Sequence, residues 1–224
     1  MKTSKKHILI ALLTLLVGSV NAQTLNWANL KKENHHIINA NFGMEYGTVF
    51  GISYGYQINA SLFPIITNME FSFPSGNNLF DDLKTKIGGQ IRLIQYRHFQ
   101  FSAKIQGVFR RQETDLVRLV NFGSDFSGIL GFYRPKWFFA GEFGFDKAIV
   151  SHFKHSNAYR DQHPQVVDGW YEPATGGNFY YGLQTGFSIK KQDIYLKAGK
   201  MFAQDFKTKP LLPFYGQLGV NIKF

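Results

Sequence analysis

The chain ends in the segment Phe214-Tyr-Gly-Gln-Leu-Gly-Val-Asn-Ile-Lys-Phe224, where apolar residues alternate with small or polar ones. Leu218, Val220, Ile222 and Phe224 share one parity, and the other parity includes Gln217, Asn221 and Lys223. Successive side chains of a β-strand point to opposite faces, so this period of two predicts a strand with one apolar face.

The same alternation recurs along most of the chain and predicts ten strands. Polar or proline-containing connections separate them, and the shorter connections alternate with the longer ones. The parity of Ile38 to Ile58 is unbroken, but one long strand there would leave an odd number, so we place a hairpin near Gly47. Eight or twelve strands remain compatible with the pattern. The predicted strands span residues 36–46, 48–58, 64–73, 87–96, 99–110, 120–133, 137–150, 178–189, 193–203 and 214–224.

The polar parity carries many charged residues among glycines, whereas the apolar parity is rich in Phe and Tyr near strand ends. This distribution favours a polar lumen and a lipid-facing exterior over the core of a soluble β-domain. The predicted fold is therefore all-β, an antiparallel up-and-down transmembrane barrel. Its predicted lumenal polar network consists of Glu45, Glu70, Arg92, Lys104, Asp125, Glu142, Asp146 and Lys197. Salt bridges that fill the lumen are the use we expect for these charges.

The composition excludes several classes of protein. The 224 residues include 23 Phe, 22 Gly and no Cys. Without cysteine there is no disulfide scaffold, thiolate zinc site or cysteine nucleophile. After the N-terminus no apolar run is long enough for a membrane helix. We find no phosphate-binding loop, dinucleotide fingerprint or nucleophile elbow, and we expect no cofactor.

The N-terminus has the pattern of a secretory signal peptide. Lys2, Lys5 and Lys6 precede an apolar run, and Val20-Asn-Ala22 gives a cleavage site before Gln23. We therefore expect a signal peptide over 1–22, a periplasmic leader over 23–35 and the barrel over 36–224. Loss of these three lysines lowers the formal net charge of +10 by three. An exported chain of this kind is not expected to bind nucleic acid.

The C-terminal segment resembles the assembly signal of small outer-membrane β-barrels of Gram-negative bacteria. Leu218, Val220, Ile222 and Phe224 carry the resemblance. It implies insertion by the barrel-assembly machinery, a location in the cell outer membrane and contact with lipopolysaccharide. A complex with another outer-membrane protein is a further expected partner.

Residues 151–178 form the connection richest in candidate chemistry. Imidazole and carboxylate ligands suit Zn²⁺, Cu²⁺ or Ni²⁺, which makes a metal-capturing loop one hypothesis. Its ligands would be His152, His155, His163 and Asp168. The alternative hypothesis is a contact surface for a partner, formed by Trp170, Tyr171 and Glu172.

The run Ser151-His-Phe-Lys-His-Ser-Asn-Ala158 resembles the H-x-S-N-A segment of lipid A 3-O-deacylases. These are small outer-membrane barrels with a Ser–His–acid site, so the resemblance implies lipid A hydrolysis. Here Lys154 stands where the family has histidine, and His155 directly precedes Ser156. Neighbouring residues of a strand point to opposite faces, so His155 could activate Ser156 only if the strand has ended.

The sequence therefore predicts a non-catalytic outer-membrane barrel. We expect a scaffold, an accessory subunit or a surface-binding protein that uses the loop 151–178. The alternatives are a narrow solute channel, a lipid A-modifying hydrolase and a metal-capturing surface loop.

Overall fold

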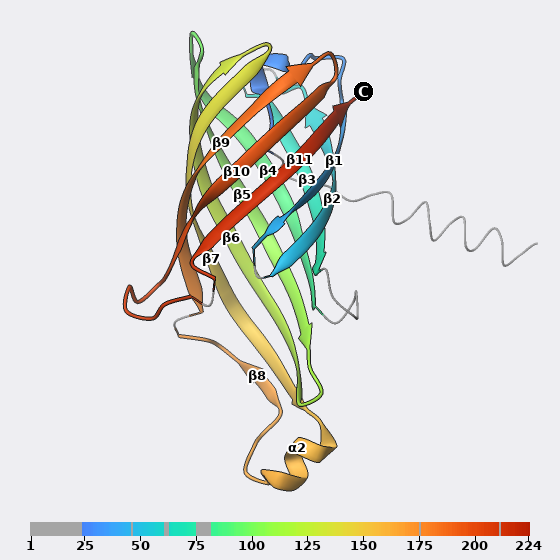
Figure 1. Cartoon of the computed structure of the whole chain (residues 1–224), viewed down its shortest axis with the longest axis vertical. Helices are drawn as coiled ribbons and strands as arrows, with labels where there is room; N and C mark the ends of the chain where they lie inside the picture. The colour runs from blue at the N-terminus through green and yellow to red at the C-terminus, as the bar shows by residue number, and fades with distance from the viewer. Residues whose placement is uncertain (1–23, 46, 61–62, 75–81, 175, 211) are drawn as a thin grey trace, which may run out of the picture.

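The computed structural model describes residues 24–45, 47–60, 63–74, 82–174, 176–210 and 212–224. Within these residues the chain forms a tall barrel of tilted strands (Figure 1). The barrel strands are β1 (His36–Met44), β2 (Thr48–Ile58), β3 (Ile65–Pro74), β4 (Asp82–Tyr96), β5 (Phe99–Glu113), β6 (Val117–Arg134), β7 (Trp137–His155), β9 (Gly177–Ile189), β10 (Gln192–Ala203) and β11 (Phe214–Lys223). The predicted signal peptide lies outside the described residues.

The barrel is closed and entirely antiparallel. Each barrel strand pairs with its neighbour in the chain, and β1 pairs with β11 to complete the circle. In that closing ladder Ile38 lies opposite Ile222, and Phe42 lies opposite Leu218. The short strand β8 (Gly169–Tyr171) pairs only with β7 and is not part of the wall. The prediction of ten antiparallel barrel strands is therefore confirmed.

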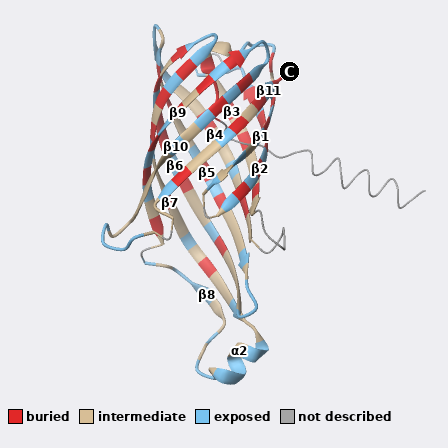
Figure 2. Ribbon diagram, in the orientation of Figure 1, coloured by how far each residue is buried: buried red, intermediate tan, exposed pale blue. Residues whose placement is uncertain are grey.

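Burial alternates along the strands with the predicted parity (Figure 2). The apolar parity points outward, and residues such as Ile52, Phe143 and Leu218 are more than half exposed. The opposite parity points into the lumen, where Asn68, Gln106 and Asp125 are almost completely buried. An apolar exterior around a polar interior is the arrangement that hydrocarbon requires of a membrane-spanning barrel.

Glycines on the lumenal parity make room for tyrosine rings. A Cβ at Gly219 would collide with the ring of Tyr195, and one at Gly199 would collide with the ring of Tyr215. The high glycine content of this parity therefore allows large aromatic side chains to fill a narrow lumen.

The two ends of the barrel differ. One end, here called the turn end, has the connections 59–64, 97–98, 135–136 and 190–191 together with the start of β1 and the end of β11. The other, the loop end, has the long connections 156–176 and 204–213. Short turns face the periplasm in outer-membrane barrels and long loops face outward. The chain is thus a transmembrane β-barrel of the outer membrane, and by this pattern we expect its turn end to face the periplasm.

The structure corrects four strand boundaries at the loop end. β4 begins at Asp82 rather than at residue 87, and β5 and β6 reach a tight turn at 114–116. β7 continues to His155, five residues beyond its predicted end. Crossing the hydrocarbon takes about 9–11 residues of a tilted strand. With 18 and 19 residues, β6 and β7 therefore extend beyond the hydrocarbon layer. There a strand can carry polar side chains on both of its faces.

Two short helical segments accompany the barrel. The 3₁₀ helix η1 (Trp27–Asn29) lies at the turn end, and α2 (Asn157–Gln162) lies beyond the loop end (Figure 1). Among the described residues no helix is long and apolar enough to span a membrane.

Candidate functional site in the barrel lumen

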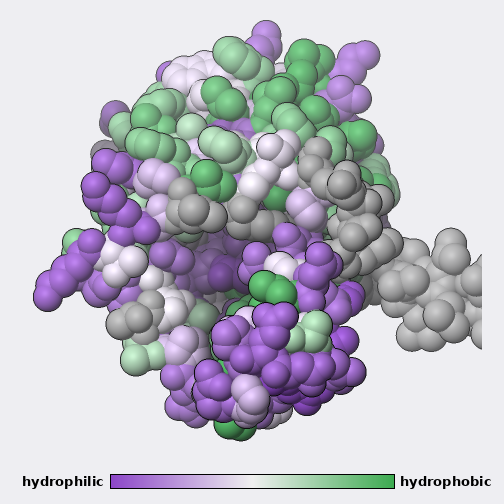
Figure 3. All heavy atoms as spheres, turned by 60° about the horizontal axis from the view of Figure 1, so that its bottom comes forward, coloured by the Kyte–Doolittle hydropathy of each residue, from purple (hydrophilic) through white to green (hydrophobic). Residues whose placement is uncertain are grey.

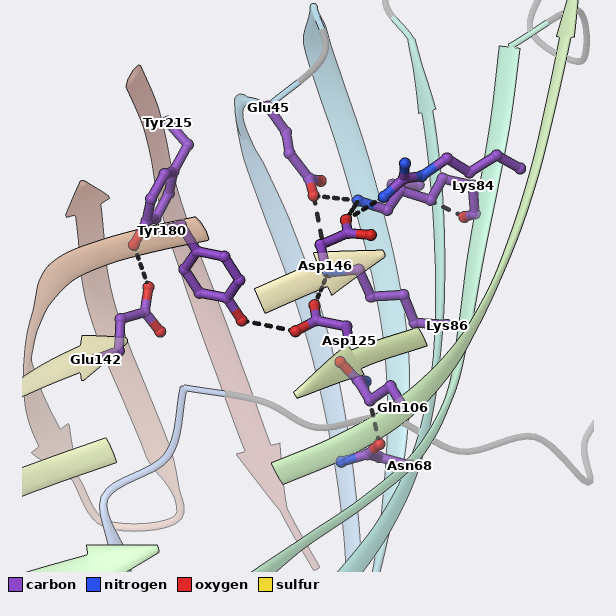
Figure 4. Close-up of polar contacts among 12 residues, drawn as sticks. Glu45, Asn68, Lys84, Lys86, Gln106, Asp125, Glu142, Asp146, Tyr180 and Tyr215 are labelled. Atoms are coloured by element: carbon purple, nitrogen blue, oxygen red, sulfur yellow. Dashed lines mark hydrogen bonds and ion pairs between the residues drawn. The ribbon is translucent and has the colours of Figure 1, made fainter. Parts of the chain in front are cut away.

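Charged side chains of alternating sign form a continuous row in the loop-end half of the lumen. Asp146 on β7 receives a hydrogen bond from Arg110 and lies 3.8 Å from the Nζ of Lys84. Lys84 on β4 donates to Glu45, which directly follows β1. These contacts link strands that are not neighbours in the wall, so they cross the lumen (Figure 4).

The row continues inward through Lys86. Its Nζ lies 3.7 Å from Glu45 Oε1 and donates to Asp125 Oδ2 at 2.9 Å. Asp125 also accepts a hydrogen bond of 2.7 Å from the hydroxyl of Tyr180. We call Arg110, Asp146, Lys84, Glu45, Lys86 and Asp125 the lumenal charge row. Pairing stabilises each of these charges in a space with little water.

A second cluster surrounds Glu142. This carboxylate accepts hydrogen bonds from Tyr215 at 2.6 Å, from Gln184 at 2.5 Å and from Lys197 at 2.9 Å. The side chain of Glu142 is fully buried. Three donors from β9, β10 and β11 therefore hold one carboxylate of β7 across the lumen.

The eight predicted network residues fall into three groups. Glu45, Asp125, Glu142, Asp146 and Lys197 make the contacts described above. Glu70 and Lys104 line the small cavity in the lumen that Asp125 and Glu45 also line. Arg92 lies nearer the turn end, with its guanidinium 5.7 Å from the centre of the Trp27 ring.

Sequence reasoning missed Lys84 and Lys86 as network members. The sequence pattern places both in a polar connection, because the predicted strand begins at residue 87. Their parity was the available signal, since they share it with Gln90 and Arg92 of the same strand.

Two adjacent spaces lie along the charge row. An outer vestibule of about 520 Å³ opens at the loop end and is lined by Arg110, Lys84 and Phe153, among others. A deeper cavity of about 60 Å³ is lined by Lys104, Asp125 and Tyr180, among others. Glu45, Asp146 and Met201 line both spaces. Seen obliquely from the loop end, the molecule shows a hydrophilic hollow, with apolar residues gathered on the barrel side above it and mainly hydrophilic residues below it (Figure 3).

The turn end of the lumen is filled by residues 24–30, here called the plug. Trp27 is only 3% exposed and belongs to an apolar cluster with Ile129, Tyr133 and Phe138 of the barrel wall. Thr24 lines the deeper cavity. The sequence assigned these residues to a periplasmic leader, whereas the structure places them within the end of the barrel. Trp27, Leu25 and Leu30 supply the apolar surface that the lumen buries there.

Polar contacts fasten the plug to the wall. Asn26 donates from its side chain to Ser188 Oγ and to the carbonyl of Arg134, both at 2.8 Å. Its backbone N–H donates to Asp193 at 3.3 Å. Asn221 donates to the carbonyl of Thr24 at 2.7 Å. Each of these bonds uses at least one side chain, so the plug is not part of the strand ladder.

The predicted contact residues lie on the outer hairpin, which comprises the end of β7, α2 and β8. Trp170 is 59% exposed, and its ring packs against His152 and against Phe122 on the outside of the barrel. Tyr171 is 43% exposed and packs against Phe153. Glu172 is exposed beside them.

The structure does not bring the four predicted metal ligands together. Opposite the junction of Phe122 and Gly123, the register of β7 shifts by one residue, so Ser151 and Phe153 face inward. His152 therefore faces outward, and His155 lies on the opposite face. Within the described ranges, no three His, Asp or Glu side chains are grouped as a metal site.

His155 pairs with Asp168 instead. Asp168 Oδ1 accepts a hydrogen bond of 2.8 Å from the backbone N–H of His155. The same oxygen lies 2.8 Å from Nδ1 of the His155 ring. The hydrogen bond from the His155 backbone and, second in size, the one with the His155 ring hold the pKa of the Asp168 carboxyl below its ordinary value. Ser156 caps α2, and its Oγ accepts from the backbone N–H of Tyr159. The strand ends at His155, and Asp168 orients the imidazole of this residue.

The proposed assembly residues lie on the lipid-facing side of β11. Leu218, Ile222 and Phe224 are each about half exposed, and the ring of Phe224 stacks on His36 at the start of β1. Their recognition by the assembly machinery stays a prediction.

Comparison with known proteins finds similarity only among solved structures. No protein-family model and no curated protein matches the chain. The KdgM porin in complex with disordered oligogalacturonate is 10% identical, with 84% of this chain and 99% of that chain covered and a TM-score of 0.41. The NanC porin is also 10% identical, with coverages of 84% and 100% and a TM-score of 0.45. At these values neither structure indicates what this chain binds.

Proposed function

We propose that this barrel is a narrow channel for small polar solutes, closed at its periplasmic end by the plug. The observation that carries the proposal is the placement of residues 24–30. They fill one end of a charged lumen, yet the bonds that fasten them to the wall depend on side chains. Because the closed strand ladder does not include the plug, the plug can leave without opening the barrel.

The arrangement of the spaces supports the same function. A vestibule of about 520 Å³ faces outward and shares Glu45 and Asp146 with the deeper cavity. Polar side chains line this route, as in barrels that conduct solutes. The cross-lumen ion pairs narrow the route and leave room for small molecules only.

A reversible cross-link tests the proposal. The chain has no cysteine, so the double variant Asn26→Cys/Ser188→Cys would contain a single engineered pair. The polar atoms of these two side chains are 2.8 Å apart across the contact between plug and wall. In planar bilayers we expect brief openings from the reduced variant and none from the oxidised variant.

Asn121→Cys/Ser151→Cys is a matched control. It has the same residue types and the same 2.8 Å contact, but it joins β6 to β7 at the loop end. Its oxidation should leave the openings unchanged. Equal conductance of the oxidised and reduced plug variants would contradict plug gating, and silence of every preparation would contradict a channel.

A second candidate function is a contact surface on the outer hairpin. It is favoured by Trp170 and Tyr171, large aromatic side chains held exposed beyond the barrel wall. Aromatic residues of this kind are enriched at protein interfaces. Purification from solubilised outer membrane should recover a partner with the wild type and lose it with Trp170→Ala/Tyr171→Ala. Recovery of the same proteins with both chains would exclude this surface.

A further inference from the structure

From the lumenal charge row, we infer that the solutes of this channel are zwitterions, namely amino acids and short peptides that carry both an ammonium and a carboxylate. This inference rests on the proposed channel function and names its substrate class. The charges of the row alternate in sign from Arg110 at the vestibule to Asp125 at the deeper cavity.

The vestibule offers both signs of charge in equal number. Its basic residues are Lys84, Arg110 and Arg111, and its acidic residues are Glu45, Asp82 and Asp146. A purely anionic solute would be repelled by as many carboxylates as there are cations to attract it. A purely cationic solute would be repelled by as many basic side chains as there are carboxylates to attract it. Neither has an electrostatic advantage at such a site.

One oxygen at the junction of the two spaces lacks a partner. Glu45 Oε1 contacts Lys84 and Lys86, but Glu45 Oε2 is buried and accepts no hydrogen bond from the described residues. Glu45 lines both the vestibule and the deeper cavity. A buried carboxylate oxygen without a donor is costly, so this position favours a ligand that supplies an N–H.

Replacement of existing pairs explains why both charges are needed on one solute. Breaking a buried ion pair is strongly unfavourable when one partner is left alone. A zwitterion avoids this, because its ammonium binds Glu45 while its carboxylate binds Lys84 or Arg110. The next pair, Lys86 with Asp125, offers the same exchange one step deeper.

The vestibule also has an apolar wall suited to a side chain. Leu119, Phe153 and Leu212 line it alongside the charged residues, together with Pro173 and Pro210. A peptide can therefore place its backbone termini on the charge row and a methyl or larger group against this wall. Amphipathic sites of this kind combine apolar contact with a few fixed polar groups.

A series of three ligands tests the inference on the wild-type chain. L-alanyl-L-alanine carries both charges, its N-acetyl derivative keeps the carboxylate and its C-terminal amide keeps the ammonium. Isothermal titration of the protein in detergent at low ionic strength should show binding of the dipeptide about tenfold tighter than either derivative, since one charge-assisted hydrogen bond is lost in each. Equal or tighter binding of a derivative, or no binding of any ligand, overturns the inference.

A pair of variants locates the site. Glu45→Gln should weaken dipeptide binding about tenfold, because the ammonium loses its charged acceptor. Glu33→Gln is the matched control, because this carboxylate pairs with Lys31 near the turn end and lines neither the vestibule nor the deeper cavity. It should leave the affinity unchanged, and an equal loss in both variants would contradict the placement. The ligand series needs no variant, so it decides the question even if Glu45→Gln does not fold.

The same preparation separates this inference from the channel itself. Conductance in a planar bilayer without dipeptide binding would overturn the zwitterion inference and leave the channel standing. Dipeptide binding without conductance would overturn the channel and leave a zwitterion-binding barrel.

Discussion

Lys223 Nζ lies 2.7 Å from Asp193 Oδ1, and both side chains are completely buried at the turn end of the barrel. The same carboxylate group accepts a hydrogen bond from the backbone of Asn26, and Lys223 donates to the carbonyl of Asn29 at 3.3 Å. One ion pair of the wall therefore also fastens the plug. Barrel stability and plug docking are coupled at this point.

Asp193→Asn should destabilise the barrel and loosen the plug together. Removal of one partner of a buried ion pair typically costs about 3–5 kcal/mol, because the other charge is left unpaired. We expect a lower urea midpoint in detergent and more frequent openings in bilayers. The double variant Asp193→Asn/Lys223→Met should recover most of the stability while the openings stay frequent. Recovery of both properties would show that Asp193 does not hold the plug.

Trp27→Ala should affect the plug much more than the barrel. Truncation of a buried tryptophan typically costs about 3–5 kcal/mol, and here the lost contacts join residues 24–30 to Ile129, Tyr133 and Phe138. The strand ladder does not include Trp27, so we expect longer channel openings and a nearly unchanged urea midpoint. Trp170→Ala is the control, since that ring lies on the outer hairpin. Unchanged gating of Trp27→Ala would contradict an apolar role in closure.

Asp125→Asn and Tyr180→Phe should differ in their effect on stability. Asp125→Asn leaves Lys86 without its closest carboxylate, which predicts a loss of about 3–5 kcal/mol. Tyr180→Phe removes the 2.7 Å hydrogen bond to Asp125 and leaves the Lys86–Asp125 ion pair in place, which predicts a loss of about 1.5–3 kcal/mol. Urea unfolding of the two variants measures the difference. Equal losses would indicate that the ion pair adds nothing to the hydrogen bond.

Strand periodicity predicted the wall of this barrel well, for a physical reason. Lipid and lumen impose opposite demands on successive residues, so segments such as Phe99 to Arg110 carry a clear period of two. The same parity identified Glu45, Asp125 and Glu142 as lumenal. Beyond the membrane both faces of a strand are wet, and the pattern fades, which is why Lys84 and the end of β7 were assigned to connections.

The plug and the His155–Asp168 pair could not be predicted in the same way. Residues 24–30 reach the wall through contacts to residues more than 100 positions away, such as Arg134 and Asp193. The alternation of neighbouring residues in the sequence gives no information about contacts at such a distance along the chain. His152 and His155 are three residues apart and therefore lie on opposite faces of β7, and the one-residue register shift that turns His152 outward leaves no sign in their spacing.

Acidification should loosen the outer hairpin through Asp168. Hydrogen bonds from His155 hold the pKa of Asp168 below its ordinary value, so their contribution is present above the ordinary carboxyl pKa. It is lost as the pH falls through the lowered value, below about pH 4. Asp168 precedes β8, so we expect the fluorescence of Trp170 to shift to the red in that range. Asp168→Asn should show the shift already at neutral pH, and Trp170→Phe should show none. A wild-type spectrum that stays constant down to pH 2 would mean that this carboxylate does not hold the hairpin.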